Sequence, residues 1–117
     1  IPLITDDEFG HFGVSDLLEK YEEYGFTVHQ LPIMDQLVSS EEEMIAMVNY
    51  LDIAIEKDEK VLLHCVGGLG RSGLVAASYL KYKGLDSDES IKAVRKVRGP
   101  RTVESKIQEE FVKNIQF

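Results

Sequence analysis

Apolar residues recur along this chain with two different periods, and stretches of each period alternate. Short apolar runs at 1–4 (IPLI), 26–31 (FTVHQL) and 60–65 (KVLLHC) predict strands. The segments between and after them carry apolar residues at helical spacing: Val14, Leu17, Leu18 and Tyr21; Met44, Met47, Val48, Leu51 and Ile55; Ile91, Val94 and Val97; and Ile107, Phe111 and Ile115. This alternation predicts an α/β fold with a mainly parallel central sheet flanked by helices.

Local signals indicate where the helices begin and end. Ser40 followed by Glu43 forms a capping box, which predicts the start of a helix. Gly25 and Gly84 stand where helices are expected to stop. The other expected boundaries are a helix from Ser72 to about Lys83, a cap at Asp86 or Ser87, and a last helix that starts near Thr102.

The segment HCVGGLGRSG, residues 64–73, connects a predicted strand to a predicted helix. Its glycines let the backbone turn its amides inward, and a helix N-terminus attracts anions. Arg71 offers a planar fork that matches two phosphate oxygens. Cys65 lies where these groups favour its thiolate, the nucleophilic form, and Ser72 can donate a hydrogen bond to the sulfur. The segment therefore predicts a phosphate-binding loop with a nucleophile at its base.

Each of these features also has an ordinary structural explanation. Glycine-rich turns between strands and helices are common, and a lone cysteine at a strand end is usually a small core residue. A nucleotide-binding loop of the Walker type needs a lysine before its serine or threonine, and GGLGRSG has none. The specific signal is the combination: a strand, His-Cys, five residues, Arg-Ser and a helix.

That combination resembles the signature of the cysteine-dependent protein tyrosine and dual-specificity phosphatases. Within this superfamily it is most similar to the small kinase-associated phosphatase group. The resemblance extends over nearly the whole chain, since PIMD at 32–35 is similar to the family's Pro-Ile-x-Asp loop and VRGPRTVESKIQEEFV at 97–112 is similar to its final segment. It implies a single phosphatase catalytic domain over residues 1–117, with the phosphate-binding loop between a central strand and a helix. Relatives carry further strand residues upstream of IPLI, so one edge of the sheet is expected to be missing.

The resemblance also implies a role for each site residue. Cys65 would be the nucleophile, Arg71 would bind the phosphate, Asp35 would be the general acid, and Ser72 would stabilise the departing thiolate. His64 would shape the loop, and Gln108 would position the water that completes the reaction. The residues expected to bind phosphate are Val66, Gly67, Gly68, Leu69, Gly70 and Arg71. No metal or cofactor is implied, because arginine and the loop amides supply the positive charge.

Composition narrows the possible substrates and partners. The net charge of −8 argues against nucleic acid or an anionic membrane as the partner. The single cysteine fits a reducing cytoplasm. The resulting expectation is a protein phosphatase acting on phosphotyrosine, and on phosphoserine and phosphothreonine, in proteins. The alternatives are a phosphoinositide phosphatase or RNA 5′-phosphatase on the same scaffold, or a phosphopeptide-binding module. The oligomeric state is left open.

Overall fold

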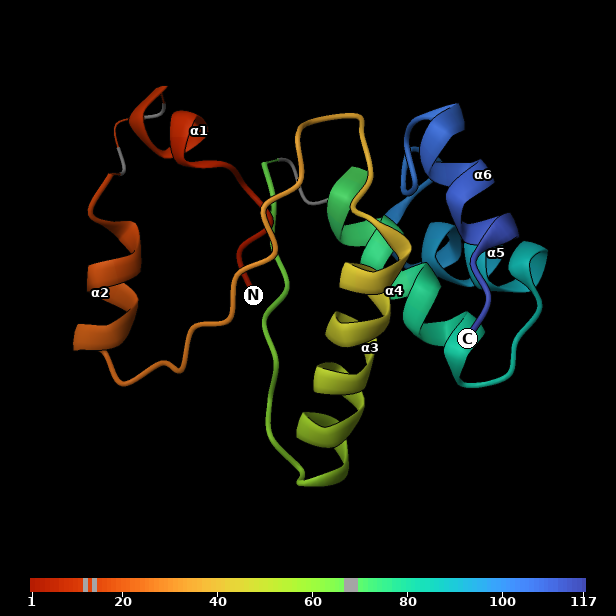
Figure 1. Cartoon of the computed structure of the whole chain (residues 1–117), viewed down its shortest axis with the longest axis horizontal. Coiled ribbons are helices and arrows are strands. Elements are labelled where there is room, and N and C mark those ends of the chain that lie inside the picture. Colours follow the sequence, from red (N-terminus) through yellow and green to blue (C-terminus); the bar gives the residue numbers. More distant parts are fainter. Residues whose placement is uncertain (12, 14, 67–69) are drawn as a thin grey trace.

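The computed structural model covers residues 1–117 and describes residues 1–11, 13, 15–66 and 70–117. The described part of the chain is mostly helical (Figure 1). Its helices are α1 (Asp6–His11), α2 (Leu17–Glu23), α3 (Glu41–Glu56), α4 (Gly70–Tyr82), α5 (Ser87–Arg98) and α6 (Lys106–Asn114). Across these residues, none of the helices is long and apolar enough to cross a lipid bilayer.

Extended segments take the place of the predicted sheet. Backbone hydrogen bonds join residues 1–3 to His64 on one side, at 2.9 and 3.1 Å, and to residues 31–33 on the other, at 2.9 and 3.2 Å. Within the described residues these bonds amount to one isolated parallel bridge, between Pro2 and His64, and not to regular strands. The predicted strand at 26–31 is likewise not formed, because its first residues have no ladder of backbone partners. The described residues therefore do not form the regular parallel sheet that the sequence predicted.

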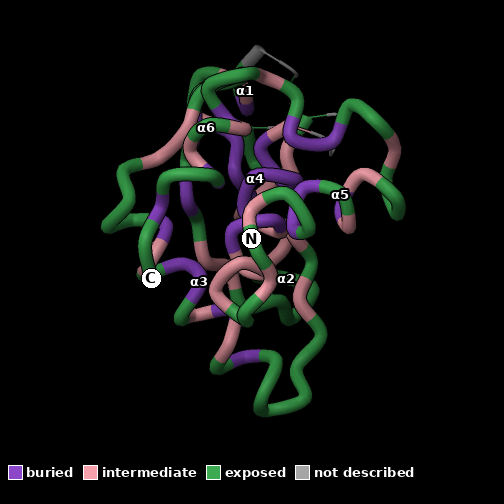
Figure 2. Tube along the Cα trace, turned by 90° about the vertical axis from the view of Figure 1, so that its right-hand side faces the viewer, coloured by how far each residue is buried: buried purple, intermediate pink, exposed green. Residues whose placement is uncertain are grey.

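Helix α4 lies at the centre of the molecule. It packs against α3, α5 and α6, and the extended segments separate these helices from α1 and α2 (Figure 1). Burial follows the same arrangement, since the buried parts of the trace gather around α4 (Figure 2). The fully buried core residues include Leu3, Met44, Val48, Leu74, Val75, Ala77, Val103, Val112 and Ile115. Arg71 and Ser72 therefore stand in the most buried helix.

The predictions that rest on neighbouring residues are confirmed. Ser40 and Glu43 form the capping box of α3, and Met44, Met47, Val48 and Leu51 of the predicted stripe are buried. Asp86, one of the two expected caps, is the N-cap of α5, and its side chain accepts a hydrogen bond from the N–H of Glu89.

Predictions that depend on neighbours distant in the sequence are less accurate. The last helix begins at Lys106 and not near Thr102, because Ser105 is its N-cap. Three residues of the predicted stripes are not buried, since Ile55, Val97 and Ile107 are 47%, 81% and 52% exposed. The predicted stripe on α2 contributes no buried residue, and its first member, Val14, lies outside the described residues. Helix α1 was not predicted at all.

A glycine permits the close contact between α4 and the loop before α6. A Cβ added at Gly73 would lie 2.5 Å from the Cγ2 of Thr102 and 2.7 Å from the backbone nitrogen of Val103. Both partners are buried, with exposures of 1% and 0%, so neither can move aside without disturbing the core. Because Gly73 has no side chain, α4 packs directly against the segment that leads to α6.

We expect Gly73→Ala to destabilise the fold by about 1–3 kcal/mol, because the added methyl group overpacks a closed contact. The matched control is Gly10→Ala in α1, where an added Cβ meets nothing within 4 Å. That control should be neutral or stabilising, since alanine has the higher helix propensity. Urea unfolding followed by circular dichroism measures both. Equal stability of the Gly73→Ala protein and the wild type would contradict the close contact.

Candidate active site

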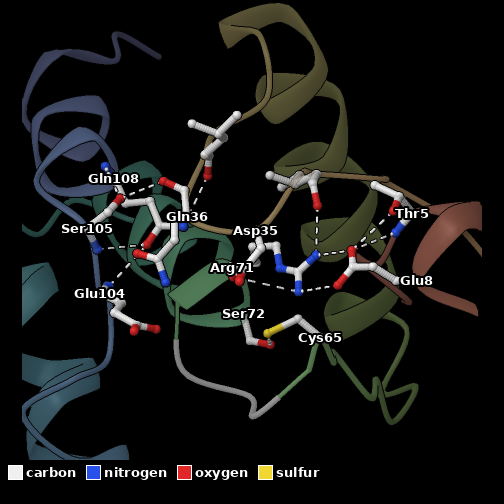
Figure 3. Close-up of polar contacts among 12 residues, drawn as sticks. Thr5, Glu8, Asp35, Gln36, Cys65, Arg71, Ser72, Glu104, Ser105 and Gln108 are labelled. Atoms are coloured by element: carbon white, nitrogen blue, oxygen red, sulfur yellow. Dashed lines mark hydrogen bonds and ion pairs between the residues drawn. The ribbon is translucent and has the colours of Figure 1, made fainter. Parts of the chain in front are cut away.

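Cys65 lies at the end of the extended segment 61–65 and faces the start of α4 (Figure 3). Ser72, in the first turn of that helix, donates a hydrogen bond from its Oγ to the cysteine Sγ at 3.1 Å. This is the contact expected from the sequence. Ser72 is buried and Cys65 is partly exposed, so the sulfur can be reached from outside while its partner is fixed. Gly67, Gly68 and Leu69, which were expected to bind phosphate, lie outside the described residues.

Arg71 is buried in the first turn of α4, and its five N–H donors divide into two groups. Its Nη1 donates to the Oε1 of Glu8 at 2.6 Å and to the carbonyl of Ile33 at 2.8 Å. Its Nη2 donates to the Oε2 of Glu8 at 2.9 Å. The two bonds to Glu8 use the edge formed by the two terminal nitrogens, and the bond to Ile33 uses the second hydrogen of Nη1. Among the described residues, the buried Nε has no hydrogen-bond partner and the second hydrogen of Nη2, on the same side, forms no hydrogen bond.

This division suits the binding of an oxyanion. A buried donor without a partner carries an energetic cost, and its usual explanation is a ligand or water that completes it. The free edge presents two parallel N–H groups, the geometry that matches two oxygens of a phosphate. Burial opposes the charged form, but the hydrogen bonds and charge of Glu8, with the charges of Cys65 and Asp35, raise the pKa of Arg71 above its ordinary value.

Glu8 is a site residue that the sequence did not reveal. It stands in α1 and holds both terminal nitrogens of Arg71 in a two-point ion pair. Its Oε1 also accepts hydrogen bonds from the backbone N–H and hydroxyl of Thr5. The hydrogen bond from Arg71 lowers the pKa of Glu8 from its ordinary 4.5 to about 2, so this carboxylate is ionised at any ordinary assay pH. Glu8 thereby fixes the orientation of the arginine.

Asp35, the expected general acid, lies on a tight turn close to the arginine. The turn is closed by a hydrogen bond from the N–H of Leu37 to the carbonyl of Met34 at 3.0 Å. One carboxylate oxygen of Asp35 lies 3.9 Å from the Nη2 of Arg71, and the side chain is 70% exposed. The structure therefore brings Asp35, Arg71, Cys65 and Ser72 into one region, with the carboxylate at the open side where a leaving group could be reached.

His64 and Gln108 form hydrogen bonds with residues outside this group. The Nε2 of His64 is 3.0 Å from the hydroxyl of Tyr21, and burial followed by the charge of the N-terminal amine lowers the pKa of this histidine. The backbone of His64 pairs with Ile1 and Leu3, and the role of His64 in shaping the loop stays a prediction. Gln108 is fully buried, and its amide is bonded to backbone groups of Glu104, Ser105 and Leu37.

A separate cavity of about 440 Å³ lies beside the extended segments. It is lined largely by apolar residues and includes His64, but the described residues around it do not include Cys65, Arg71 or Asp35. It is thus distinct from the candidate site. In the described part of the chain, no group of three or more His, Cys, Asp and Glu side chains is placed to hold a metal ion.

The ion pair of Glu8 with Arg71 predicts how stability depends on pH. Glu8→Gln should lower the free energy of unfolding at pH 7 by about 3 kcal/mol, because it leaves a buried arginine without its counter-charge. The carboxylate stabilises the fold above its ordinary pKa of 4.5, and this contribution is lost as the pH falls toward about 2. The difference between wild type and variant should therefore shrink over that range. Urea titrations at several pH values measure it.

Asp7→Asn serves as the control for this experiment, since Asp7 is an exposed neighbour on α1. Its stability should stay close to that of the wild type at every pH. If Glu8→Gln gave a difference from wild type that did not change between pH 5 and pH 2.5, the ion pair would not be the source of the stability.

Comparisons with known proteins agree with this geometry. The family described as "polymorphic toxin system, DSP-PTPase phosphatase" matches residues 14–85, which include the turn of Asp35 and the Cys65 loop. Cyclin-dependent kinase inhibitor 3 of Sus scrofa is 33% identical over 103 residues, covering 86% of this chain and 49% of the relative. An uncharacterized protein of Methanocaldococcus jannaschii is 33% identical over 82 residues, covering 70% of this chain and 50% of the relative. The chain thus spans about half the length of the curated relatives it matches.

Two solved structures have similar folds. Kinase-associated phosphatase with its catalytic cysteine replaced by serine superposes with a TM-score of 0.91 at 28% identity, covering 95% of this chain and 64% of that one. The active form of Tk-PTP gives a TM-score of 0.86 at 32% identity, covering 97% of this chain and 74% of that one. With the family match over most of its length, the chain belongs to the DSP-PTPase phosphatase family.

Proposed function

We propose that this chain is a cysteine-dependent protein phosphatase that hydrolyses phosphotyrosine, and also phosphoserine and phosphothreonine, through a cysteinyl-phosphate intermediate. The observation that carries the proposal is the free edge of Arg71, whose buried Nε has no partner among the described residues, next to the Sγ of Cys65, which is bonded to Ser72. This is an oxyanion site with a nucleophile beside it. The relatives named as phosphatases support the same reaction class.

The first chemical step transfers the phosphoryl group to sulfur. The Cys65 thiolate attacks phosphorus in line, so an S–P bond forms as the bond from phosphorus to the ester oxygen breaks. The free edge of Arg71 and the amides of residues 66–71 hold the equatorial oxygens as charge spreads over them. Asp35 gives its proton to the departing oxygen, which leaves as an alcohol or phenol.

The second step returns the enzyme to its starting state. Asp35, now ionised, takes a proton from a water molecule that attacks phosphorus. The S–P bond breaks, inorganic phosphate forms, and the thiolate of Cys65 is stabilised by the hydroxyl of Ser72, which lies 3.1 Å from the sulfur. The roles of Val66, Gly67, Gly68, Leu69 and Gly70 as amide donors and of Gln108 in placing the water stay predictions.

The remaining expectations belong to the same proposal. Three extended segments that run in the same direction support a mainly parallel sheet at the centre of one catalytic domain. The mechanism needs Cys65 as a free thiol, which the reducing cytoplasm maintains, so we place the activity there. Phosphorylated proteins are the proposed substrates. The loop sequence VGGLG has no lysine and the net charge is −8, and both features disfavour phosphoinositides and RNA ends.

A substrate panel tests this function. We expect the wild type to hydrolyse p-nitrophenyl phosphate, phosphotyrosine peptides and phosphothreonine peptides faster than phosphoinositides or RNA 5′-triphosphate ends. Cys65→Ser should abolish turnover but keep vanadate binding, because the anion site remains. Ser72→Ala should slow the second step, so that a burst of one product equivalent per enzyme precedes steady turnover. A Cys65→Ser protein with substantial turnover would exclude the covalent mechanism, and a wild type that binds phosphopeptides without hydrolysis would be a binding module.

Removing the general acid should affect substrates unequally. Asp35→Asn should slow kcat/KM for phenyl phosphate about 10²-fold or more, but much less for p-nitrophenyl phosphate, whose leaving group needs little proton transfer. The alkaline limb of the pH–rate profile should flatten, because the variant has no carboxyl group to act as the acid at this position. Steady-state rates from pH 5 to pH 8 measure both effects. An unchanged profile would assign the acid to another residue.

A further inference from the structure

The turn that carries Asp35 is bonded to the start of α6, about seventy residues later in the chain (Figure 3). The Oγ of Ser105 donates to the carbonyl of Gln36 at 2.8 Å, and the Nε2 of Gln108 donates to the carbonyl of Leu37 at 3.0 Å. These carbonyls belong to the two residues that follow Asp35. We call Ser105 and Gln108 the α6 clamp.

Both members of the α6 clamp are themselves held in place. Ser105 is the N-cap of α6, and its Oγ accepts the N–H of Gln108 at 3.1 Å. The Oε1 of Gln108 accepts the N–H groups of Glu104 and Ser105 at 3.0 and 3.2 Å, which completes a capping box. Gln108 is fully buried. Its side chain is therefore fixed at one end by α6, and the other end is aimed at the turn.

The turn needs such support because its backbone is strained. Gln36 has a φ of 67°, in the left-handed region that a side chain disfavours. In a four-residue turn this third position normally carries glycine or asparagine when φ is positive. A strained residue persists when the surrounding structure holds it. The bond from Ser105 to the carbonyl of Gln36 supplies that hold at the strained residue itself.

The carboxylate of Asp35 has little packing of its own, since its side chain is 70% exposed. Its position next to Arg71 is therefore determined by the backbone of the turn. We propose that Ser105 and Gln108 are positioning residues, which hold Asp35 where it can protonate the leaving group. The inference rests on the proposed function and deepens it. The N-terminal end of α6, with its N-cap, sets the efficiency of proton transfer from Asp35 in the first step.

This role differs from the predicted role of Gln108 in placing water. A residue that places water acts in the second step, after the leaving group has gone, so its loss affects all substrates alike. A residue that positions the acid acts in the first step, and its loss affects poor leaving groups most. The ratio kcat/KM reports only steps up to the first irreversible one, so it separates the two roles.

The experiment measures kcat/KM for phenyl phosphate and p-nitrophenyl phosphate with Ser105→Ala, Ser105→Thr and Gln108→Met. We expect Ser105→Ala and Gln108→Met to lose about tenfold on phenyl phosphate and less than about twofold on p-nitrophenyl phosphate. Ser105→Thr keeps the hydroxyl and should recover most of the loss. The matched control is Ser40→Ala, which removes the same kind of capping box from α3 and should leave the ratio of the two substrates unchanged.

A double-mutant cycle completes the test. In an Asp35→Asn background, Ser105→Ala should change kcat/KM by less than about twofold, because there is no acid left to position. An equal loss on both substrates, or a loss that persists in that background, would overturn the α6 clamp. If Asp35→Asn is selective for phenyl phosphate and the clamp variants are not, the clamp fails and the proposed function stands. If the wild type shows no hydrolysis that depends on Cys65, both the proposed function and the α6 clamp fail.

Discussion

A buried positive charge organises this molecule. Arg71 is 1% exposed, and a guanidinium group cannot lose its proton to escape the cost of burial. Its compensation comes from Glu8 in α1 and from the carbonyl of Ile33 at the end of an extended segment. One side chain at the start of α4 thereby joins segments that are 38 and 63 residues away in the chain. Their positions relative to Cys65 follow from this requirement.

The site is consequently assembled from four separate parts of the chain. Helix α1 orients the arginine, the turn at 34–37 carries the carboxylate, the loop and α4 carry the nucleophile with its partner, and the start of α6 holds the turn. Across the residues that the structure describes, none of these parts contains a regular strand, so the geometry depends on side chains that bond to backbone carbonyls. Ser105, Gln108 and Arg71 each make such a bond.

The sequence predicted well what depends on near neighbours. The capping box at Ser40 and Glu43 and the hydrogen bond between Cys65 and Ser72 join residues three and seven positions apart, and a short motif contains each. Glu8 escaped prediction because α1 is six residues long, has no apolar periodicity, and meets its partner only in the folded chain. Val97 fits a helical stripe perfectly, but whether a stripe is covered depends on where other helices end. How far extended segments pair through their backbones also depends on residues that are distant in the sequence.

The charge balance around Arg71 bears on how the reaction ends. Glu8 places a negative charge 2.6 Å from the one positive group, and Asp35, whose carboxyl group lies 3.9 Å away, carries a proton again once the second step is complete. The pocket therefore offers a phosphate directed hydrogen bonds and no surplus of positive charge. A free inorganic phosphate ion, with no side chain or peptide attached, gains only those bonds. Product departure should accordingly be fast, and free phosphate in the surrounding solution should be a weak competitor of a substrate that adds contacts outside the pocket.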